Sequence, residues 1–336
     1  MTGPVITIAM DRKRTTYVLP DRLKERLGSL GRLSTSFPLQ DLSATDLPIA
    51  VHETEILVTG WGAPRIDAAF LRQMPQLKMI AHAAGTVKGL IDGSVFDAGI
   101  VVTHAADANA QPVAEFTLAA ILFAGKKVFR FRDLYINDRG RARTRTMQAE
   151  PIGNYRRIIG LIGASKIGRR VIQLLKPFDY QILLYDPFVS EAEAADLGVT
   201  LSSLENLMAE SDIVSVHAPS LASTRHMIND DLLSSMKEGA TFINTARGAL
   251  VDEAALLKHL RVGRIDAIID VTEPEIPQQN SDFYDLPNVF LTPHIAGAIG
   301  LEQTRLGEMA VDEVARFING ERLHHAICKK DLEYMA

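Results

Sequence analysis

Three polar side chains that could do chemistry stand at the ends of successive apolar segments in the second half of the chain. They are Arg247 in NTARGALVDE, Glu275 in DVTEPEIP and His294 in LTPHIAG. A histidine exchanges a proton near neutral pH, and a neighbouring carboxylate orients its imidazole and stabilises the charged ring. An arginine offers a fixed fork of donors to a carboxylate. Together these types suit hydride transfer to a carbonyl beside a carboxylate, because the carbonyl oxygen then needs a proton.

Each of these residues also has a simpler explanation. Arg247 could form a surface ion pair, Glu275 could be a solvated loop carboxylate, and His294 could be a hydrogen-bonded strand-end histidine. For each residue alone, that explanation is at least as good. The three are harder to dismiss together, because the ends of consecutive strands in one parallel sheet meet at the same edge, where ligands bind in open α/β sheets.

A candidate dinucleotide-binding turn precedes them along the chain. The segment IIGLIGASKIGRRVIQLL has the pattern of a strand, a Gly-rich turn and a helix. Gly163 can make the tight turn, and Gly168 lets the helix approach the strand. Ser165 replaces the middle glycine of the usual fingerprint, and its hydroxyl could be an added donor to a pyrophosphate. Taken alone, this degraded motif could also be only a turn between a strand and a helix.

Asp186 strengthens the case for a dinucleotide. It ends the apolar segment QILLYD, 18 residues after Gly168 (186 minus 168). A carboxylate at this position would accept hydrogen bonds from the adenine ribose hydroxyls and repel a ribose phosphate, which favours NAD over NADP. The alternative is a turn residue at a strand end before proline.

Six segments resemble the successive signature blocks of the D-isomer-specific 2-hydroxyacid dehydrogenases: GLIGASKIG, LYDP, SVHAP, INTARGALVDE, DVTEPEIP and LTPHIAGA. The resemblance runs from about residue 80 through the C-terminal helix. It implies NAD as cofactor, a small 2-hydroxy or 2-keto acid as substrate, and catalytic roles for Arg247, Glu275 and His294. It also implies that the catalytic acid stands five residues after Asp270, at Glu275 rather than Glu273. The cofactor-binding positions that it implies further are Lys166, Ile167, His217, Ala218, Thr224, Thr245, Ala246, Asp270 near the nicotinamide carboxamide, and Gly297.

The segment HAAGTVKGLID resembles the loop of that family whose backbone amides hold the substrate carboxylate. The resemblance places Gly85, Thr86 and Val87 at the substrate. Lys88 departs from the family pattern; it could add charge for a further anionic group, but a solvated loop lysine is the better expectation. Asn109 matches a family position near the substrate, and it would also suit the cap of a helix that begins at Pro112.

Alternating apolar and amphipathic segments predict an α/β protein, and 336 residues are enough for two cores. We expect two Rossmann-like or flavodoxin-like, doubly wound parallel-sheet domains. The NAD-binding domain (106–298) would be inserted in the substrate domain (1–105 plus 299–336). A single long helix is expected over 112–131, a charged loop over 138–157, and a final helix over 301–320.

Composition excludes several classes of function. Hydrophobic residues make up 47% of the chain, and the net charge of -5 gives no attraction to nucleic acid or anionic membranes. The apolar stretch 113–125 is too short to span a bilayer, which takes about 20 residues. The only cysteine, Cys328, excludes an intrachain disulfide and a thiolate metal cluster. We expect no metal site, no secretory signal and a cytoplasmic location.

The helix expected at 113–131 is apolar around most of its circumference, which predicts a homodimer through this region. Two other functions stay open. One is a dehydrogenase of another small anion, such as formate or a phosphorus oxyacid. The other is a nucleotide-sensing binding protein resembling the transcriptional corepressors of the same fold; the lack of a long disordered tail or a basic recognition surface disfavours it.

Overall fold

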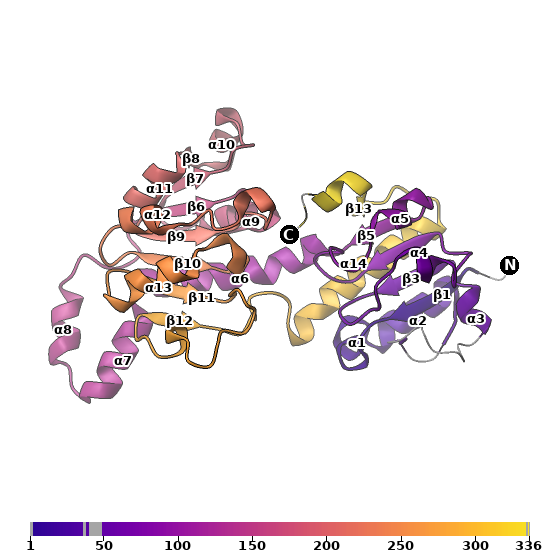
Figure 1. Ribbon diagram of the computed structural model, residues 1–336, viewed down its shortest axis with the longest axis horizontal. Helices are drawn as coiled ribbons and strands as arrows, with labels where there is room; N and C mark the ends of the chain where they lie inside the picture. The colour runs from indigo at the N-terminus through magenta and orange to yellow at the C-terminus, as the bar shows by residue number, and fades with distance from the viewer. Residues whose placement is uncertain (1–2, 36–37, 40–48, 334, 336) are drawn as a thin grey trace. The chain divides into compact units, whose positions relative to one another are not determined.

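The computed structural model describes residues 3–35, 38–39, 49–333 and 335. The chain divides into two compact units (Figure 1). The first comprises Met1–Ala110 and Ala298–Ala336, and the second comprises Gln111–Gly297. The second unit is therefore inserted in the first. The crossings fall at 110/111 and 297/298, where the sequence places them at 105/106 and 298/299.

The sheet of the first unit has the strand order β13-β5-β4-β3-β1-β2 and is parallel except for β13. Its strands are β1 (Val5–Ala9), β2 (Arg32–Leu33), β3 (Ile56–Thr59), β4 (Met79–His82), β5 (Val101–His104) and β13 (Ala326–Ile327). Its helices are α1 (Arg12–Val18), α2 (Asp21–Leu30), α3 (Ile49–His52), α4 (Ala68–Leu71), α5 (Gly93–Asp97), α14 (Gln303–Ile318), and the 3-10 helices η4 (Gly300–Glu302) and η5 (Lys329–Glu333). One apolar cluster joins the sheet to α1, α2 and α14, and another joins its opposite face to α4 and α5.

The sheet of the second unit is wholly parallel, in the order β12-β11-β10-β9-β6-β7-β8. Its strands are β6 (Ile158–Ile162), β7 (Gln181–Tyr185), β8 (Thr200–Leu201), β9 (Ile213–Val216), β10 (Thr241–Asn244), β11 (Asp266–Ile269) and β12 (Val289–Leu291). Its helices are α9 (Lys166–Leu175), α10 (Glu191–Leu197), α11 (Leu204–Glu210), α12 (Asp230–Ser235), α13 (Glu253–Arg261), and the 3-10 helices η1 (Ala222–Thr224), η2 (Gly248–Leu250) and η3 (Asp282–Tyr284). The strand order reverses between β6 and β9, and ligands bind at such a switch point, beyond the carboxyl ends of the strands.

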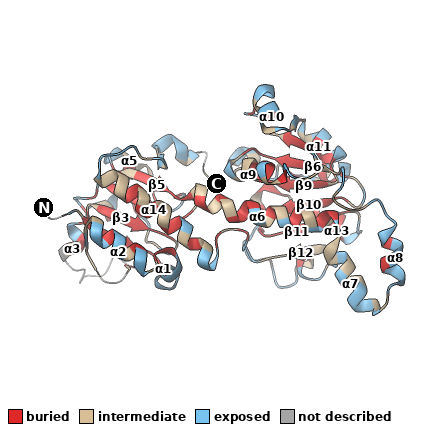
Figure 2. Ribbon diagram, turned by 180° about the vertical axis from the view of Figure 1, so that it is seen from behind, coloured by how far each residue is buried: buried red, intermediate tan, exposed pale blue. Residues whose placement is uncertain are grey.

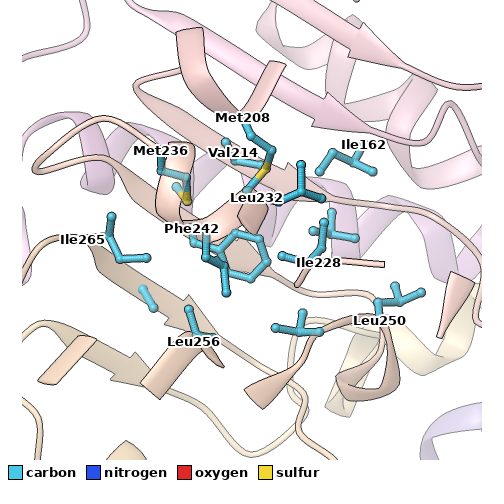
Figure 3. Close-up of a cluster of buried hydrophobic side chains, with 14 of the residues drawn as sticks. Ile162, Met208, Val214, Ile228, Leu232, Met236, Phe242, Leu250, Leu256 and Ile265 are labelled. Atoms are coloured by element: carbon cyan, nitrogen blue, oxygen red, sulfur yellow. The ribbon is translucent and has the colours of Figure 1, made fainter. Parts of the chain in front are cut away.

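The core of the second unit explains why these strands carry unbroken apolar sequence. Figure 3 shows Phe242 of β10 surrounded by side chains from β6, β9 and the helices on one face of the sheet. Phe242 is wholly buried. A second cluster covers the opposite face and includes Ile121 and Val171. Because both faces are covered, alternation of polar and apolar residues is lost, as expected for a doubly wound sheet. In Figure 2 the inner strands of both sheets are accordingly red, whereas the edge strand β12 is tan.

The expected single helix over 112–131 is wrong in both its start and its continuity. Helix α6 spans Ala106–Gly125 with Pro112 inside it, and α7 spans Val128–Asp138. Lys127 separates them in the left-handed region, with φ of 51°. Its ammonium donates to Gly239 O, to Thr241 Oγ1 at 3.2 Å and to Asp266 Oδ2 at 2.8 Å. This anchorage to β10 and β11 interrupts the helix, and local sequence does not encode it.

Two smaller expectations fail nearby. The charged segment 138–157 contains a helix, α8 (Ala142–Gln148), which buries Thr144 and Met147. Asn109 is not a cap before Pro112, because it lies inside α6. The final helix comes close to its expected bounds: α14 ends at Ile318, and Gly320 follows with φ of 69°.

Candidate active site

The Gly-rich turn joins β6 to α9 at the carboxyl edge of the second sheet. Gly163 has φ of 99°, and a Cβ there would lie 2.7 Å from Ala218 N. A Cβ on Gly168 would overlap with Gly163 O. Both positions therefore need glycine, the first for its backbone conformation and for space and the second for the close approach of helix and strand.

Ser165 is the N-cap of α9. Its Oγ accepts from Gly168 N at 3.3 Å, and its φ of -61° needs no glycine. The serine thus satisfies one of the free amides at the helix start, and its hydroxyl proton can still be donated. Lys166 and Ile167 begin α9 immediately after it.

Asp186 follows β7 and faces this turn. Its Oδ2 accepts from Ala164 N at 2.7 Å, and its Oδ1 accepts from Phe188 N at 2.9 Å. The carboxylate therefore joins the Gly-rich turn to the end of the neighbouring strand. Each carboxylate oxygen can accept a further hydrogen bond.

The segment after β9 lies against the same turn. His217 is buried, and burial lowers its pKa to about 4, so the ring is neutral at pH 7. Its Nε2 lies 3.0 Å from Ser215 Oγ, and no partner for its Nδ1 is present in the part of the chain that the structure describes. Further along, the Thr224 hydroxyl donates to Pro219 O at 2.7 Å and closes the turn that follows.

Arg247 stands just beyond β10, in a turn held by Asn244. The Asn244 amide donates to Arg247 O at 2.9 Å, and its Oδ1 accepts from Ala246 N at 3.0 Å. The guanidinium donates to Ala246 O at 2.6 Å. Burial lowers the pKa of Arg247 and the charge of Glu275 opposes this shift; an arginine remains protonated at neutral pH. Thr245 follows Asn244 in this turn, and its hydroxyl oxygen lies 3.0 Å from the hydroxyl oxygen of Thr117 in α6.

Asp270, at the end of β11, organises the loop that carries His294. Its buried carboxylate accepts from Thr292 Oγ1 at 2.6 Å, from Ile295 N at 2.8 Å and from Ala296 N at 2.9 Å. Its carbonyl accepts from His294 N at 2.9 Å. These four bonds stabilise a loop in which His294 has φ of 54°, unusual for a residue other than glycine. Gly297 follows the loop and is the last residue of the second unit.

His294 and Glu275 are in direct contact through Nδ1 and Oε1. Both side chains are partly exposed, so a ligand can reach them. The other candidate carboxylate, Glu273, is paired instead with Arg225, at 2.7 Å. The structure thus brings Glu275, not Glu273, to the histidine.

In the first unit, Gly85 of the predicted substrate loop lies next to Asn109. A Cβ on Gly85 would lie 3.2 Å from Asn109 Nδ2, and Asn109 Oδ1 accepts from Ala298 N at 3.1 Å. Beneath the loop, His82 contacts Thr59 Oγ1 at 2.9 Å. Burial lowers the pKa of His82 to about 4, against the effect of a hydrogen bond to the Thr86 backbone.

The remaining loop residues differ in exposure. Val87 is wholly buried, so its side chain faces the apolar core and only its backbone is suited to a ligand. Lys88 is exposed, as expected for a solvated loop lysine, and its Nζ donates to Met335 O at 3.1 Å.

Comparison with known proteins decides the family. Residues 118–296 match the D-isomer specific 2-hydroxyacid dehydrogenase, NAD binding domain. The chain is 32% identical over 279 residues to a D-3-phosphoglycerate dehydrogenase of Mycobacterium tuberculosis, with 83% of this chain and 52% of that protein covered. The chain belongs to the D-isomer-specific 2-hydroxyacid dehydrogenase family.

Two further matches extend over most of the length of the matched protein. A glyoxylate reductase of Aeropyrum pernix is 34% identical over 262 residues, 76% of this chain and 78% of that protein. A solved structure from Thermus thermophilus superposes with a TM-score of 0.71 at 29% identity, covering 96% of this chain and 99% of the other. The chain spans about half the length of the phosphoglycerate dehydrogenases that it matches.

Within this dehydrogenase family, the predicted fold of two parallel-sheet α/β domains is confirmed, as is the NAD-binding domain. Among the residues that the structure describes, no group of three or more histidine, cysteine, aspartate or glutamate side chains could hold a metal ion. No helix in the described ranges is long and apolar enough to cross a membrane.

The residues that support the two turns carrying Arg247 and His294 were not identified from the sequence. Asn244 and Thr292 fix the turns that carry Arg247 and His294. An asparagine ending a buried strand is a recognisable turn residue, so Asn244 could have been found. Thr292 could not, because its role depends on Asp270, which is distant in sequence.

Proposed function

We propose that this chain transfers a hydride between NAD and a small 2-keto or D-2-hydroxy acid. The observation that carries the proposal is the contact between His294 and Glu275, on the same sheet edge as Arg247 and the Gly-rich turn. A proton donor, its carboxylate partner and a fixed cation are the groups that reduction of a carbonyl next to a carboxylate requires.

Each residue of the site has a separate role in the proposed reaction. Bound NADH would supply the hydride. His294, protonated and held by Glu275, gives its proton to the carbonyl oxygen as charge develops there, and in the reverse direction the neutral ring takes it back. Arg247 binds the substrate carboxylate and polarises the carbonyl; its partial burial and its fixed turn reduce the reorganisation that binding needs.

The second unit has the features that a dinucleotide requires. Gly163 and Gly168 leave a turn that any Cβ would fill, and α9 directs its free amides towards a pyrophosphate placed there. Asp186 would accept from the ribose hydroxyls. The positions after β9, β10 and β11, including His217, Ala218, Thr245, Ala246 and Asp270, end neighbouring strands of the same sheet.

We assign the substrate carboxylate to the backbone amides of Gly85, Thr86 and Val87, with Asn109 beside them. The names of the relatives, phosphoglycerate dehydrogenase and glyoxylate reductase, cover both phosphorylated and very small acids. Those names therefore support a small anionic substrate without choosing its side chain.

The test is a panel of 2-keto acids with NADH, from glyoxylate to longer and phosphorylated members, followed by loss of the nicotinamide absorbance. Turnover of at least one acid is expected, with His294→Ala as the inactive control. If NADH binds but no acid is reduced, and if NAD is not reduced by formate, a phosphorus oxyacid or another small anion, the nucleotide-sensing function replaces this one.

We also propose a cytoplasmic homodimer that associates through α6 and α7. Large apolar side chains there are solvent-exposed in the single chain: Phe123 by 47%, Tyr135 by 58% and Ile136 by 61%. The exposed free thiol of Cys328 suits a reducing compartment.

Light scattering should give twice the chain mass, and Tyr135→Lys with Ile136→Lys should give monomers. The control is Val262→Lys, which changes an apolar residue at the end of α13 that is exposed by 75%. A parent protein that is monomeric at micromolar concentration would contradict the proposal.

A further inference from the structure

The turn 272–275, which carries Glu275, is held by groups that take no part in the proposed proton transfer. Thr272 Oγ1 contacts Pro274 O at 2.8 Å and Glu275 O at 3.2 Å. On the other side of the turn, a Cβ at Gly248 would overlap with the backbone of Thr272 and Glu273. The segment after Arg247 and the segment before Glu275 are therefore packed backbone against backbone.

Glu253, the first residue of α13, completes this arrangement. Its Oε1 accepts from Glu273 N at 2.7 Å. The bonded amide lies two residues before Glu275. A half-buried carboxylate that accepts from a backbone amide restricts the position of that amide more firmly than a neutral acceptor would.

We propose that Glu253 is a positioning residue of this active site, which presents Glu275 to His294 by holding the Glu273 amide. The inference rests on the proposed function for the meaning of the Glu275–His294 pair. Among the residues that the structure describes, the Glu253 carboxylate bonds to the Glu273 amide and makes no hydrogen bond to His294 or Arg247.

The charges around Glu253 make this hold sensitive to pH. Burial, and to a smaller extent the charge of Glu273, raise the pKa of Glu253 to about 7, although the bond to the Glu273 amide opposes the shift. The carboxylate of Glu273 is paired with Arg225 at 2.7 Å, and His226 Nε2 lies 3.8 Å from it.

The other charged groups nearby are already engaged. Asp252 caps α13 through Ala255 N. On the neighbouring helices, Asp230 is paired with Lys258 and His259. Among these carboxylates, Glu253 is the one whose pKa is raised towards neutrality, and its ionised form is the stronger acceptor.

The experiment follows the ring of His294 by NMR in the full chain, without substrate. Loss of the hold should move Glu275 away from His294, so the ring should lose its proton at lower pH in Glu253→Ala than in the parent. Glu275→Gln, measured in parallel, defines the full effect. Glu253→Gln keeps an amide oxygen as acceptor and should restore most of the parent titration. If Glu253→Ala folds poorly, Glu253→Asp withdraws the acceptor by one methylene and should shift the titration in the same direction.

Asp252→Ala is the matched control. It removes a carboxylate from the adjacent position and weakens the start of α13, but it leaves the Glu273 amide bonded. It should lower Tm and leave the His294 titration unchanged. A parent-like titration in both Glu253→Ala and Glu253→Asp would overturn the proposal, and so would an equal shift in Asp252→Ala. Because the measurement needs no substrate, failure of the keto-acid panel would be a separate result.

Stability gives a second measurement. A carboxylate with a raised pKa in the folded chain stabilises it below the pKa of the unfolded chain, and this contribution is lost as pH rises through about 7. The Tm of Glu253→Gln, compared with that of the parent, should therefore rise between pH 5 and pH 8. A Tm difference that stays constant would overturn the pH dependence of the hold.

Discussion

At the scale of single residues, the site depends on which of two close carboxylates meets the histidine. Glu273 and Glu275 stand in one short turn, and nothing in their local sequence distinguishes their chemistry. Only the family resemblance selected Glu275. The structure supplies a physical reason: Arg225 holds Glu273, and His294 contacts Glu275.

Replacing Glu275 by Gln should separate the two directions of the reaction. The amide keeps the shape but removes the charge that favours the protonated ring. Reduction, which needs protonated His294, should fade at a more acidic pH than in the parent, and oxidation should persist to lower pH. Rates measured from pH 5 to 9 in both directions test this. Profiles identical to those of the parent would show that the carboxylate is not coupled to the proton donor.

Asp186→Asn tests the choice of cofactor with little change in structure. The asparagine oxygen can still accept from one backbone amide, but the charge that repels a ribose phosphate is gone. The ratio of kcat/KM for NADH to that for NADPH should fall by about tenfold, which corresponds to about 1.4 kcal/mol. Glu191→Gln, at the start of α10, is a control that should leave the ratio unchanged. A parent enzyme that prefers NADPH would contradict the role of Asp186.

At the scale of elements, the longer strands and the final helix could be predicted, but the boundaries of α6 and α7 could not. Unbroken apolar runs identify β6, β9 and β10 because both faces of a parallel sheet are covered. The break between α6 and α7 had no local signal, since the left-handed conformation of Lys127 depends on acceptors in β10 and β11. The same holds for Glu253, whose partner is 20 residues away.

The Gly-rich turn allows a test of close packing between elements. In Gly168→Ala the added methyl would overlap with Gly163 O, so α9 must move away from β6. NADH affinity should fall at least tenfold and the second unit should lose about 1–3 kcal/mol of stability. Gly28→Ala in α2 is the opposite case: its methyl meets nothing within 4 Å, and it should stabilise the first unit by about 0.5–1 kcal/mol. Calorimetry and NADH titration measure both; equal effects would contradict the packing argument.

At the scale of the whole molecule, each unit contains a buried histidine whose pKa is strongly lowered, His82 in the first and His217 in the second. Burial lowers the pKa of each from 6.5 to about 4. The unfolded chain therefore binds more protons between these values. The stabilising contribution is complete above pH 6.5 and is lost as pH falls through about 4.

Acidification should consequently destabilise both units. Each histidine should account for about 3 kcal/mol between pH 7.5 and pH 4, from the size of its shift. Urea unfolding across this range, with tryptophan and far-UV signals, measures the loss. His217→Asn should be less stable than the parent at pH 7.5 but lose less on acidification. A parallel pH dependence in parent and variant would show that His217 does not titrate as expected.

Pro112 lies inside α6, close to the boundary between the two units. Proline has no amide hydrogen, so the carbonyl of Ala108 has no donor four residues on, and the boundary between the units, 110/111, lies within this single gap in the helix. A gene fragment that starts at codon 111 would therefore cut α6 where one backbone hydrogen bond of the helix is already absent. Pro112 would then stand in the first turn of the shortened helix, where proline is favoured. Gln111 is therefore the residue at which a fragment expressing the NAD-binding unit by itself should begin.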